Sequence, residues 1–108
     1  MPNLLEREFT DEIQRLYTVT GEAVGSWPTR YLEKVRLIGG LRAAQEALKP
    51  TAGIAPGLRR LAKEYRLDLS LEDIVLQEPW CQLFSTAELR IARERLAVVR
   101  KTQSLRNS

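Results

Sequence analysis

Three carboxylates stand close together in the segment R-L-D-L-S-L-E-D-I-V-L-Q-E-P-W of residues 66–80. Asp68, Glu72 and Asp73 fall within six positions, and carboxylate oxygens are the ligands that Mg²⁺ and Mn²⁺ prefer. The group could therefore hold a metal ion or act as an acid–base pair. Apolar and polar residues also alternate over residues 67–71, as they do in a half-buried strand.

Helical signals explain more of this segment than a strand does. If Ser70 is an N-cap, Asp73 is the third helical residue, and Leu69 and Ile74 occupy the two positions of a hydrophobic staple. A strand here would find no second convincing strand in the chain to pair with. We therefore expect a helix over residues 71–77, with carboxylates in its first turn that stabilise it through backbone donors and the macrodipole.

The residue types that catalysis and metal binding use most are missing. The chain has no histidine and a single cysteine, which excludes an internal disulfide, the common zinc, copper and non-haem iron sites, and every Ser-His-Asp or Cys-His arrangement. No phosphate-binding loop is visible either. We expect no catalytic, metal-binding or cofactor-binding residues, and a protein that is not an enzyme.

Apolar residues recur every three or four positions over most of the chain, as they do on helices with one buried face. Glycines and prolines divide this pattern into short segments. The predicted helices cover about residues 4–19, 27–38, 41–48, 56–65, 71–77 and 86–102. We expect an all-α fold, a compact bundle of five or six short helices.

Length and composition predict one globular domain. The 108 residues are 44% hydrophobic and 29% charged, which is typical of an ordinary folded domain. We expect a single helical domain at residues 1–102 and a polar tail at residues 103–108 that frays. No stretch is long and apolar enough to span a membrane, and acidic residues stand where a signal peptide would be basic, so we expect a cytoplasmic protein without membrane contact.

Two helix starts carry specific capping signals. Asn3 and Glu6 could form a capping box for the first helix, with Thr10 as an alternative cap if that helix begins later. For the last helix, Ser85 and Glu88 have the spacing of a capping box.

In the fourth helix, the predicted inner stripe is Leu58, Leu61, Ala62 and Tyr65.

Bulky or soft side chains stand near the predicted helix boundaries. They are Trp27, Tyr31, Trp80, Cys81 and Phe84, and they could line a groove for a partner. The chain has only two tryptophans, three tyrosines and two phenylalanines, so a small core needs most of them inside. We favour core packing, with the cysteine as a buried apolar residue.

Basic residues gather on the predicted outer faces of the fourth and last helices. The candidate interaction surface consists of Arg59, Arg60, Lys63, Arg66, Arg90, Arg93 and Arg100. We expect a non-enzymatic interaction or accessory domain that binds another protein, an acidic one, through this surface. The sequence predicts no oligomeric state.

Nucleic acid is the alternative partner, because the same side chains bind phosphates. The contacts would come from Arg59, Arg60, Lys63, Arg90 and Arg93, with Arg95, Lys101 and Arg106 beside them on the last helix. The net charge of +3 is small for a dedicated phosphate-binding surface. The connection over residues 49–55 is also longer than the three or four residues of a helix-turn-helix turn, which favours weak phosphate contact over base reading.

Four segments together resemble a small helical module that recurs in uncharacterised bacterial proteins. They are W-P-T-R-Y-L, G-G-L-x-A-A, L-D-L-S-L-E and L-F-S-x-x-E-L-x-x-A-R-x-R-L, and they span residues 27–96. Their matching positions are mostly glycines, caps and core apolar residues, so the resemblance implies a common fold more than a common chemistry. It implies no established activity, although similar segments occur beside DNA-processing and defence functions.

Overall fold

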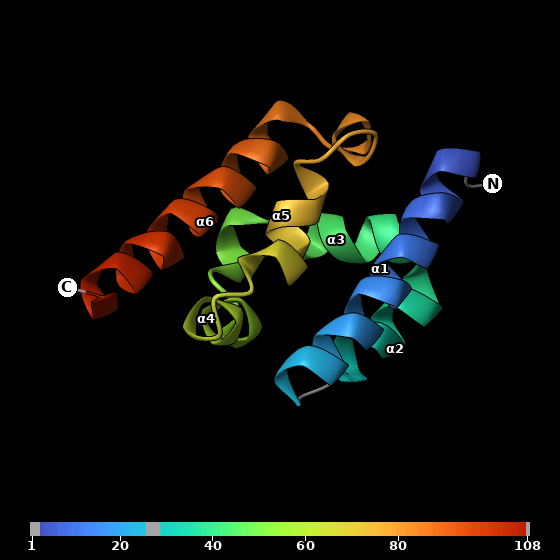
Figure 1. The fold of residues 1–108 in the computed structure, drawn as a ribbon. Helices are drawn as coiled ribbons and strands as arrows, with labels where there is room; N and C mark the ends of the chain where they lie inside the picture. The colour runs from blue at the N-terminus through green and yellow to red at the C-terminus, as the bar shows by residue number, and fades with distance from the viewer. Residues whose placement is uncertain (1–2, 26–28, 108) are drawn as a thin grey trace.

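The described residues form an all-α fold, as the sequence predicts (Figure 1). The computed structural model describes residues 3–25 and 29–107, with the backbone alone for residue 102 and residues 104–107. Within these ranges the chain forms α1 (Leu4–Val24), α2 (Thr29–Ile38), α3 (Gly40–Ala47), η1 (Pro50–Ala52), α4 (Pro56–Lys63), η2 (Leu67–Leu69), α5 (Leu71–Val75), η3 (Trp80–Leu83) and α6 (Thr86–Asn107), where η marks a 3-10 helix, and no strand. None of the helices described is long and apolar enough to cross a membrane.

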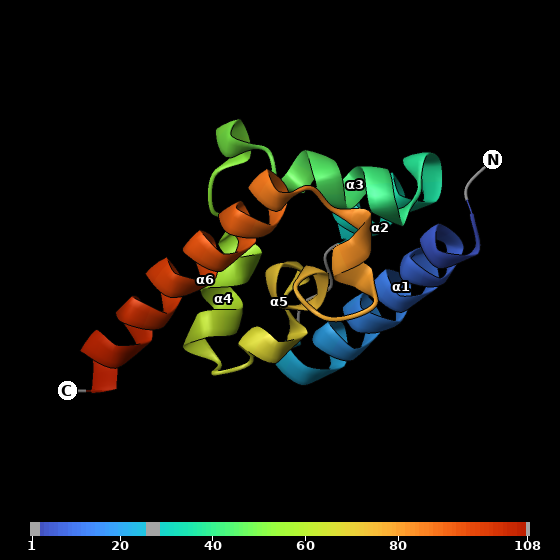
Figure 2. The same ribbon diagram turned by 90° about the horizontal axis from the view of Figure 1, so that it is seen from above.

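Helices α1 and α6 lie on opposite sides of the molecule (Figures 1 and 2). Helices α2 and α3 pack against α1 and against each other, whereas α4 packs along α6. The segment of η2 and α5 contacts both groups, since η2 touches α1 and α4 and α5 touches α6. The segment that first suggested an acidic site is therefore the centre of the fold.

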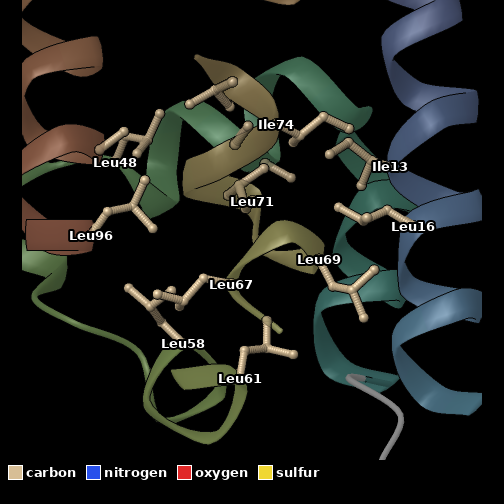
Figure 3. Packing of buried hydrophobic residues seen from close by; sticks show 14 of the residues in the cluster. Ile13, Leu16, Leu48, Leu58, Leu61, Leu67, Leu69, Leu71, Ile74 and Leu96 are labelled. Carbon is tan, nitrogen blue, oxygen red and sulfur yellow. The ribbon is translucent and has the colours of Figure 1, made fainter. Parts of the chain in front are cut away.

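Leucines of this central segment join the two sides of the core. Figure 3 shows Leu67 beside Leu58 of α4, and Leu69 turned toward Leu16 of α1, while Leu71 of α5, the helix that contacts α6, lies above them in the view. All five are buried. Full burial of one such side chain contributes about 1.5–3 kcal/mol, so the central segment supplies much of the energy that holds the helices together.

The two predicted serine caps are confirmed. The Ser70 hydroxyl oxygen accepts a hydrogen bond from the backbone N–H of Asp73 at 3.0 Å, and α5 begins directly after it. At α6 the capping box is complete: Ser85 Oγ accepts from the N–H of Glu88 at 3.1 Å, and Glu88 Oε1 accepts from the N–H of Ser85 at 2.8 Å. Each cap fixes the residue at which its helix begins.

Helix α1 begins after Asn3, whose Oδ1 accepts a hydrogen bond from the N–H of Glu6 at 2.9 Å. Thr10 is not a cap but lies inside the helix. Its hydroxyl donates to the Glu6 carbonyl at 3.2 Å and accepts from the N–H of Gly40 at 2.9 Å. Thr10 therefore fastens the start of α3 to α1.

Helix α1 ends later than the sequence predicts, at Val24 rather than residue 19. Thr20 does not break the helix, because its hydroxyl donates to the Leu16 carbonyl at 2.9 Å and is buried. The helix stops before Gly25, whose φ of 68° is the left-handed conformation that glycine adopts readily. Burial against the rest of the fold thus outweighs the low helix propensity of residues 20 and 21.

The prediction that Tyr65 belongs to the inner stripe of α4 is wrong. Leu58, Leu61 and Ala62 are buried as expected, but Tyr65 is 54% exposed. Helix α4 stops at Lys63, and Tyr65 has a φ of 57°, which turns the chain away from the helical path. Helix α5 also ends earlier than predicted, at residue 75 instead of residue 77.

Three of the aromatic residues pack together in or against the core, as expected for Trp80 and Phe84. Phe9 lies with its ring centroid 5.7 Å from that of Trp80 and 5.4 Å from that of Phe84. Cys81 is partly exposed, contrary to the prediction that it is buried. Trp27 and the expected helix start beside it lie outside the described residues.

The backbone of residues 103–107, within the predicted tail, is helical in the structure. Helix α6 continues to Asn107, five residues past the expected domain boundary at residue 102. Gln103 explains the start of this extension, because its Nε2 donates a hydrogen bond to the Ala62 carbonyl of α4 at 2.7 Å. A polar side chain that we expected in a frayed tail thus fastens α6 to α4.

Replacement of Gly40 by alanine should destabilise the fold by about 1–3 kcal/mol or more. The new Cβ would lie 2.7 Å from the Thr10 Cα, a backbone atom that cannot rotate away. Gly57→Ala is the matched control, since no atom lies within 4 Å of its Cβ position, and it should be neutral or stabilise α4 by up to about 1 kcal/mol. Urea unfolding of both variants measures the difference, and equal effects would contradict the close approach of α1 and α3.

Candidate functional site

The three carboxylates of the central segment have separate partners. Asp68 pairs with Arg66 through two hydrogen bonds, of 3.1 and 3.2 Å. Asp73 Oδ2 accepts from Gln77 Nε2 at 2.9 Å, and Glu72 is buried. Over residues 3–25 and 29–107 no group of three or more potential ligand residues could hold a metal ion. The spacing of these carboxylates therefore does not create a shared acidic site.

Glu72 instead forms a buried ion pair with Arg95, 3.7 Å from Oε2 to Nη1. The two residues are 6% and 7% exposed. The Arg95 guanidinium also donates to the carbonyls of Ala47 at 2.6 Å and Lys49 at 2.8 Å, where α3 ends. A cation there is further stabilised by the negative end of the α3 macrodipole. One side chain thus joins α3, α5 and α6.

The interpretation of Arg95 as part of the basic surface is wrong. It lies three residues after Ala92 and four before Val99, both of which are buried. That spacing puts Arg95 on the edge of the inward stripe of α6, a signal that the sequence contained. Its partner could not be found in this way, because Glu72 lies on another helix.

Burial raises the pKa of Glu72 above its ordinary value of 4.5, although its own backbone N–H and Arg95 act in the opposite direction. Tyr17 and Tyr31 lie nearby, with ring centroids 4.9 Å apart. Burial also raises the pKa of both phenols, and the negative charge of Glu72 adds to that effect. The groups are enclosed by helices and hold the fold together, so we interpret them as structural.

Arg95→Met should destabilise the protein by about 3–5 kcal/mol, because Glu72 would be left as a buried charge without its partner. The carbonyls of Ala47 and Lys49 would lose their donors as well. Arg93→Met, at an exposed position two residues away, should change stability by no more than about 0.5 kcal/mol. Chemical unfolding of the two variants tests this, and a similar small change in both would show that the pair is dispensable.

Glu72→Gln should reveal the raised pKa of Glu72 as a pH-dependent stability difference. A folded pKa above the unfolded value means that the folded protein binds the proton more tightly, so ionisation costs stability. The unfolding free energy of the wild type minus that of the variant should fall as pH rises above about 4.5, then level off above the folded pKa. Unfolding curves between about pH 4 and pH 8 measure it. A difference that increases with pH in this range would contradict the raised pKa.

Three residues of the candidate surface already have carboxylate partners. Arg66 pairs with Asp68 as described above, and the other two pairs are Arg60 with Glu64, at 3.4 Å, and Arg90 with Glu94, at 3.9 Å. Arg60 Nη2 also donates to the Val24 carbonyl at 3.1 Å, at the end of α1. Arg60 thus links α4 to α1, whereas Arg66 and Arg90 pair with neighbours in the sequence.

The other four residues form what we call the unpaired basic set: Arg59, Lys63, Arg93 and Arg100. All four are exposed, and none has a carboxylate partner in the part of the chain that the structure describes. Arg59 and Lys63 are four residues apart on α4, and Arg93 and Arg100 are seven apart on α6, so each pair shares one helical face. Because α4 packs along α6, the set lies on two neighbouring helices.

An open groove of about 940 Å³ lies elsewhere, between α1 and the corner of α2 and α3. Its charged lining has both signs. Glu6, Arg7 and Asp11 come from α1, Arg36 from α2 and Arg42 from α3. No residue of the unpaired basic set reaches it. The groove therefore concentrates neither sign of charge and does not extend the basic surface.

Comparison of the chain with protein-family models, with curated proteins and with solved structures finds no match. The resemblance to a bacterial helical module is not tested by these comparisons and stays a prediction. A functional proposal must therefore start from the side chains themselves, and the unpaired basic set is the feature to explain.

Proposed function

We propose that the chain is a non-enzymatic interaction domain that binds an acidic protein through the unpaired basic set. The observation that supports this proposal is the lack of carboxylate partners for these four exposed cations among the described residues. An arginine that already has a carboxylate must give up that pair when it binds a partner, which offsets the gain. The unpaired residues have no such cost, so they should contribute most of the binding energy.

The carboxylates on the same helices favour a protein over nucleic acid. Glu64 directly follows the last residue of α4 and Glu94 lies on α6. Both are exposed among the basic residues. Duplex DNA carries one negative charge about every 1.7 Å along its axis, and it would meet these two carboxylates as well as the cations. A protein surface with both signs of charge can complement each of them.

Rigid attachment of α6 and α4 supports the same proposal. The ion pair of Glu72 with Arg95 and the hydrogen bond from Gln103 to Ala62 hold α6 against the rest of the fold. Binding residues on helices held in this way lose less conformational freedom on binding. The unpaired basic set is thus presented on a preorganised surface.

Arg93→Glu combined with Arg100→Glu should abolish binding of the acidic partner, with at least about a tenfold loss of captured protein, because like charges face each other at the interface. The matched control is Arg30→Glu with Arg36→Glu, which makes the same charge change at exposed positions of α2. Immobilised wild type and variants would be incubated with nuclease-treated extract of the native cells, and the retained proteins quantified. Equal retention by all three would contradict the proposal.

The same capture experiment, repeated with extract that has not been treated with nuclease, tests the nucleic-acid alternative. If nuclease removes everything that the wild type captures, duplex DNA becomes the partner to test. Binding to DNA would then weaken with salt, and the slope of log K against log salt would fall by about one for each phosphate contact removed by mutation.

A further inference from the structure

Two carboxylates stand among the cations of α4 and α6. Glu64 pairs with Arg60 at 3.4 Å, and Glu94 pairs with Arg90 at 3.9 Å. The four side chains are between 47% and 69% exposed. Both pairs are therefore hydrated, and exposed pairs of this kind contribute little to stability. The free energy of unfolding thus gives little reason for a carboxylate at either position.

The order of the residues reduces the value of these pairs to their helices further. In both pairs the arginine comes four residues before the glutamate, which is the less favourable order for two charges on one helix. Glu64 also directly follows the last residue of α4. There its charge is repelled by the negative end of the helix macrodipole. Local helix stability therefore does not explain Glu64, and it explains Glu94 only weakly.

Both carboxylates lie close to the unpaired basic set. Glu94 directly follows Arg93 and precedes Arg100 by six residues, and Glu64 directly follows Lys63. At a rise of about 1.5 Å per residue, these separations are about 9 Å or less along the helix axes. The Debye length at about 0.1 M salt is about 10 Å. The negative potential of each carboxylate therefore reaches the cations beside it.

A nucleic acid and a protein respond differently to such a surface. Duplex DNA gains affinity from the phosphates that cations neutralise. A carboxylate between the cations repels the nearest phosphates, and it also occupies an arginine that would otherwise contact one. A protein with both signs of charge can place a cation or a hydrogen-bond donor opposite each carboxylate. The two glutamates thus lower the affinity for nucleic acid without an equal loss for a protein.

We propose that Glu64 and Glu94 are specificity-determining residues, which exclude nucleic acid from the candidate interaction surface. This inference rests on the proposed function, and it adds how the surface distinguishes its acidic protein partner from DNA. The discrimination comes from an unfavourable contact with the wrong partner, rather than from a stronger contact with the right one.

Glu64→Gln with Glu94→Gln, which we call the surface variant, tests the proposal with a short labelled DNA duplex as the probe. The change removes two charges at nearly constant side-chain size and releases Arg60 and Arg90 from their carboxylates. Fluorescence anisotropy at about 0.1 M salt should show DNA binding at least about tenfold tighter than that of the wild type. The slope of log K against log salt should become steeper by about one for each released arginine that contacts a phosphate.

Glu8→Gln with Glu33→Gln is the matched control variant. Both carboxylates are exposed, on α1 and α2. Helix α1 lies on the opposite side of the molecule from α6 (Figures 1 and 2), and α2 packs against α1. The control variant loses the same negative charge as the surface variant. Its DNA binding should tighten by less than about threefold at about 0.1 M salt, because distant charges are screened.

Capture of protein by the same variants separates discrimination from a general weakening of the surface. From nuclease-treated extract, the surface variant should retain no more of the acidic protein than the wild type, because that partner complements both carboxylates. Circular dichroism checks that every variant is folded. Glu94→Gln alone is a second, smaller change, and it should steepen the salt slope of DNA binding by about one.

Equal changes in DNA affinity for the surface and control variants overturn the proposal, because the positions of the carboxylates then do not matter. A rise in protein capture as large as the rise in DNA affinity also overturns it, since the carboxylates then weaken the surface toward every anion. If charge reversal of Arg93 and Arg100 still reduces protein capture in these cases, the proposed function stands while this inference fails. Capture that this reversal leaves unchanged contradicts the proposed function instead, whatever the DNA measurements show.

Discussion

The arrangement of the helices depends on the buried Arg95 guanidinium. A charged group loses its hydration when it is enclosed, at a cost of several kcal/mol unless other groups replace the water. Here the carbonyls of Ala47 and Lys49 and the carboxylate of Glu72 do so. These acceptors come from the end of α3 and from α5, so the donor on α6 is satisfied only when all three helices are in place. The apolar core supplies stability, and this polar contact restricts how the helices can be arranged.

The same contact decides which face of α6 is exposed. With Arg95 inside, Arg93 and Arg100 must face solvent, because they lie about 140–160° around the helix from it at 100° per residue. The capping box of Ser85 and Glu88 fixes the start of α6, and therefore the register of every later residue. Local capping and one buried charge together set the position of the basic surface.

Local interactions could be predicted from the sequence, whereas contacts between distant residues could not. The Ser70 and Ser85 caps depend on residues three positions apart, and both are confirmed. Arg95 bonds to a carbonyl 48 positions away, and no periodicity within one helix reveals such a partner. For the same reason, the sequence suggested seven basic surface residues without showing which of them have intramolecular partners. The function assigned to those residues remains a prediction.

Two acidic residues of the central segment each pair with an arginine. Asp68 neutralises Arg66 at the surface, and Glu72 neutralises Arg95 in the interior. Among the described residues neither carboxylate belongs to a group that could hold a metal ion. Asp68 pairs with one arginine of the candidate interaction surface, and Glu72 holds Arg95 away from solvent. The segment that first suggested acid chemistry therefore acts through electrostatics: it pairs Arg66 at the surface and Arg95 in the interior, while the unpaired basic set lies on α4 and α6.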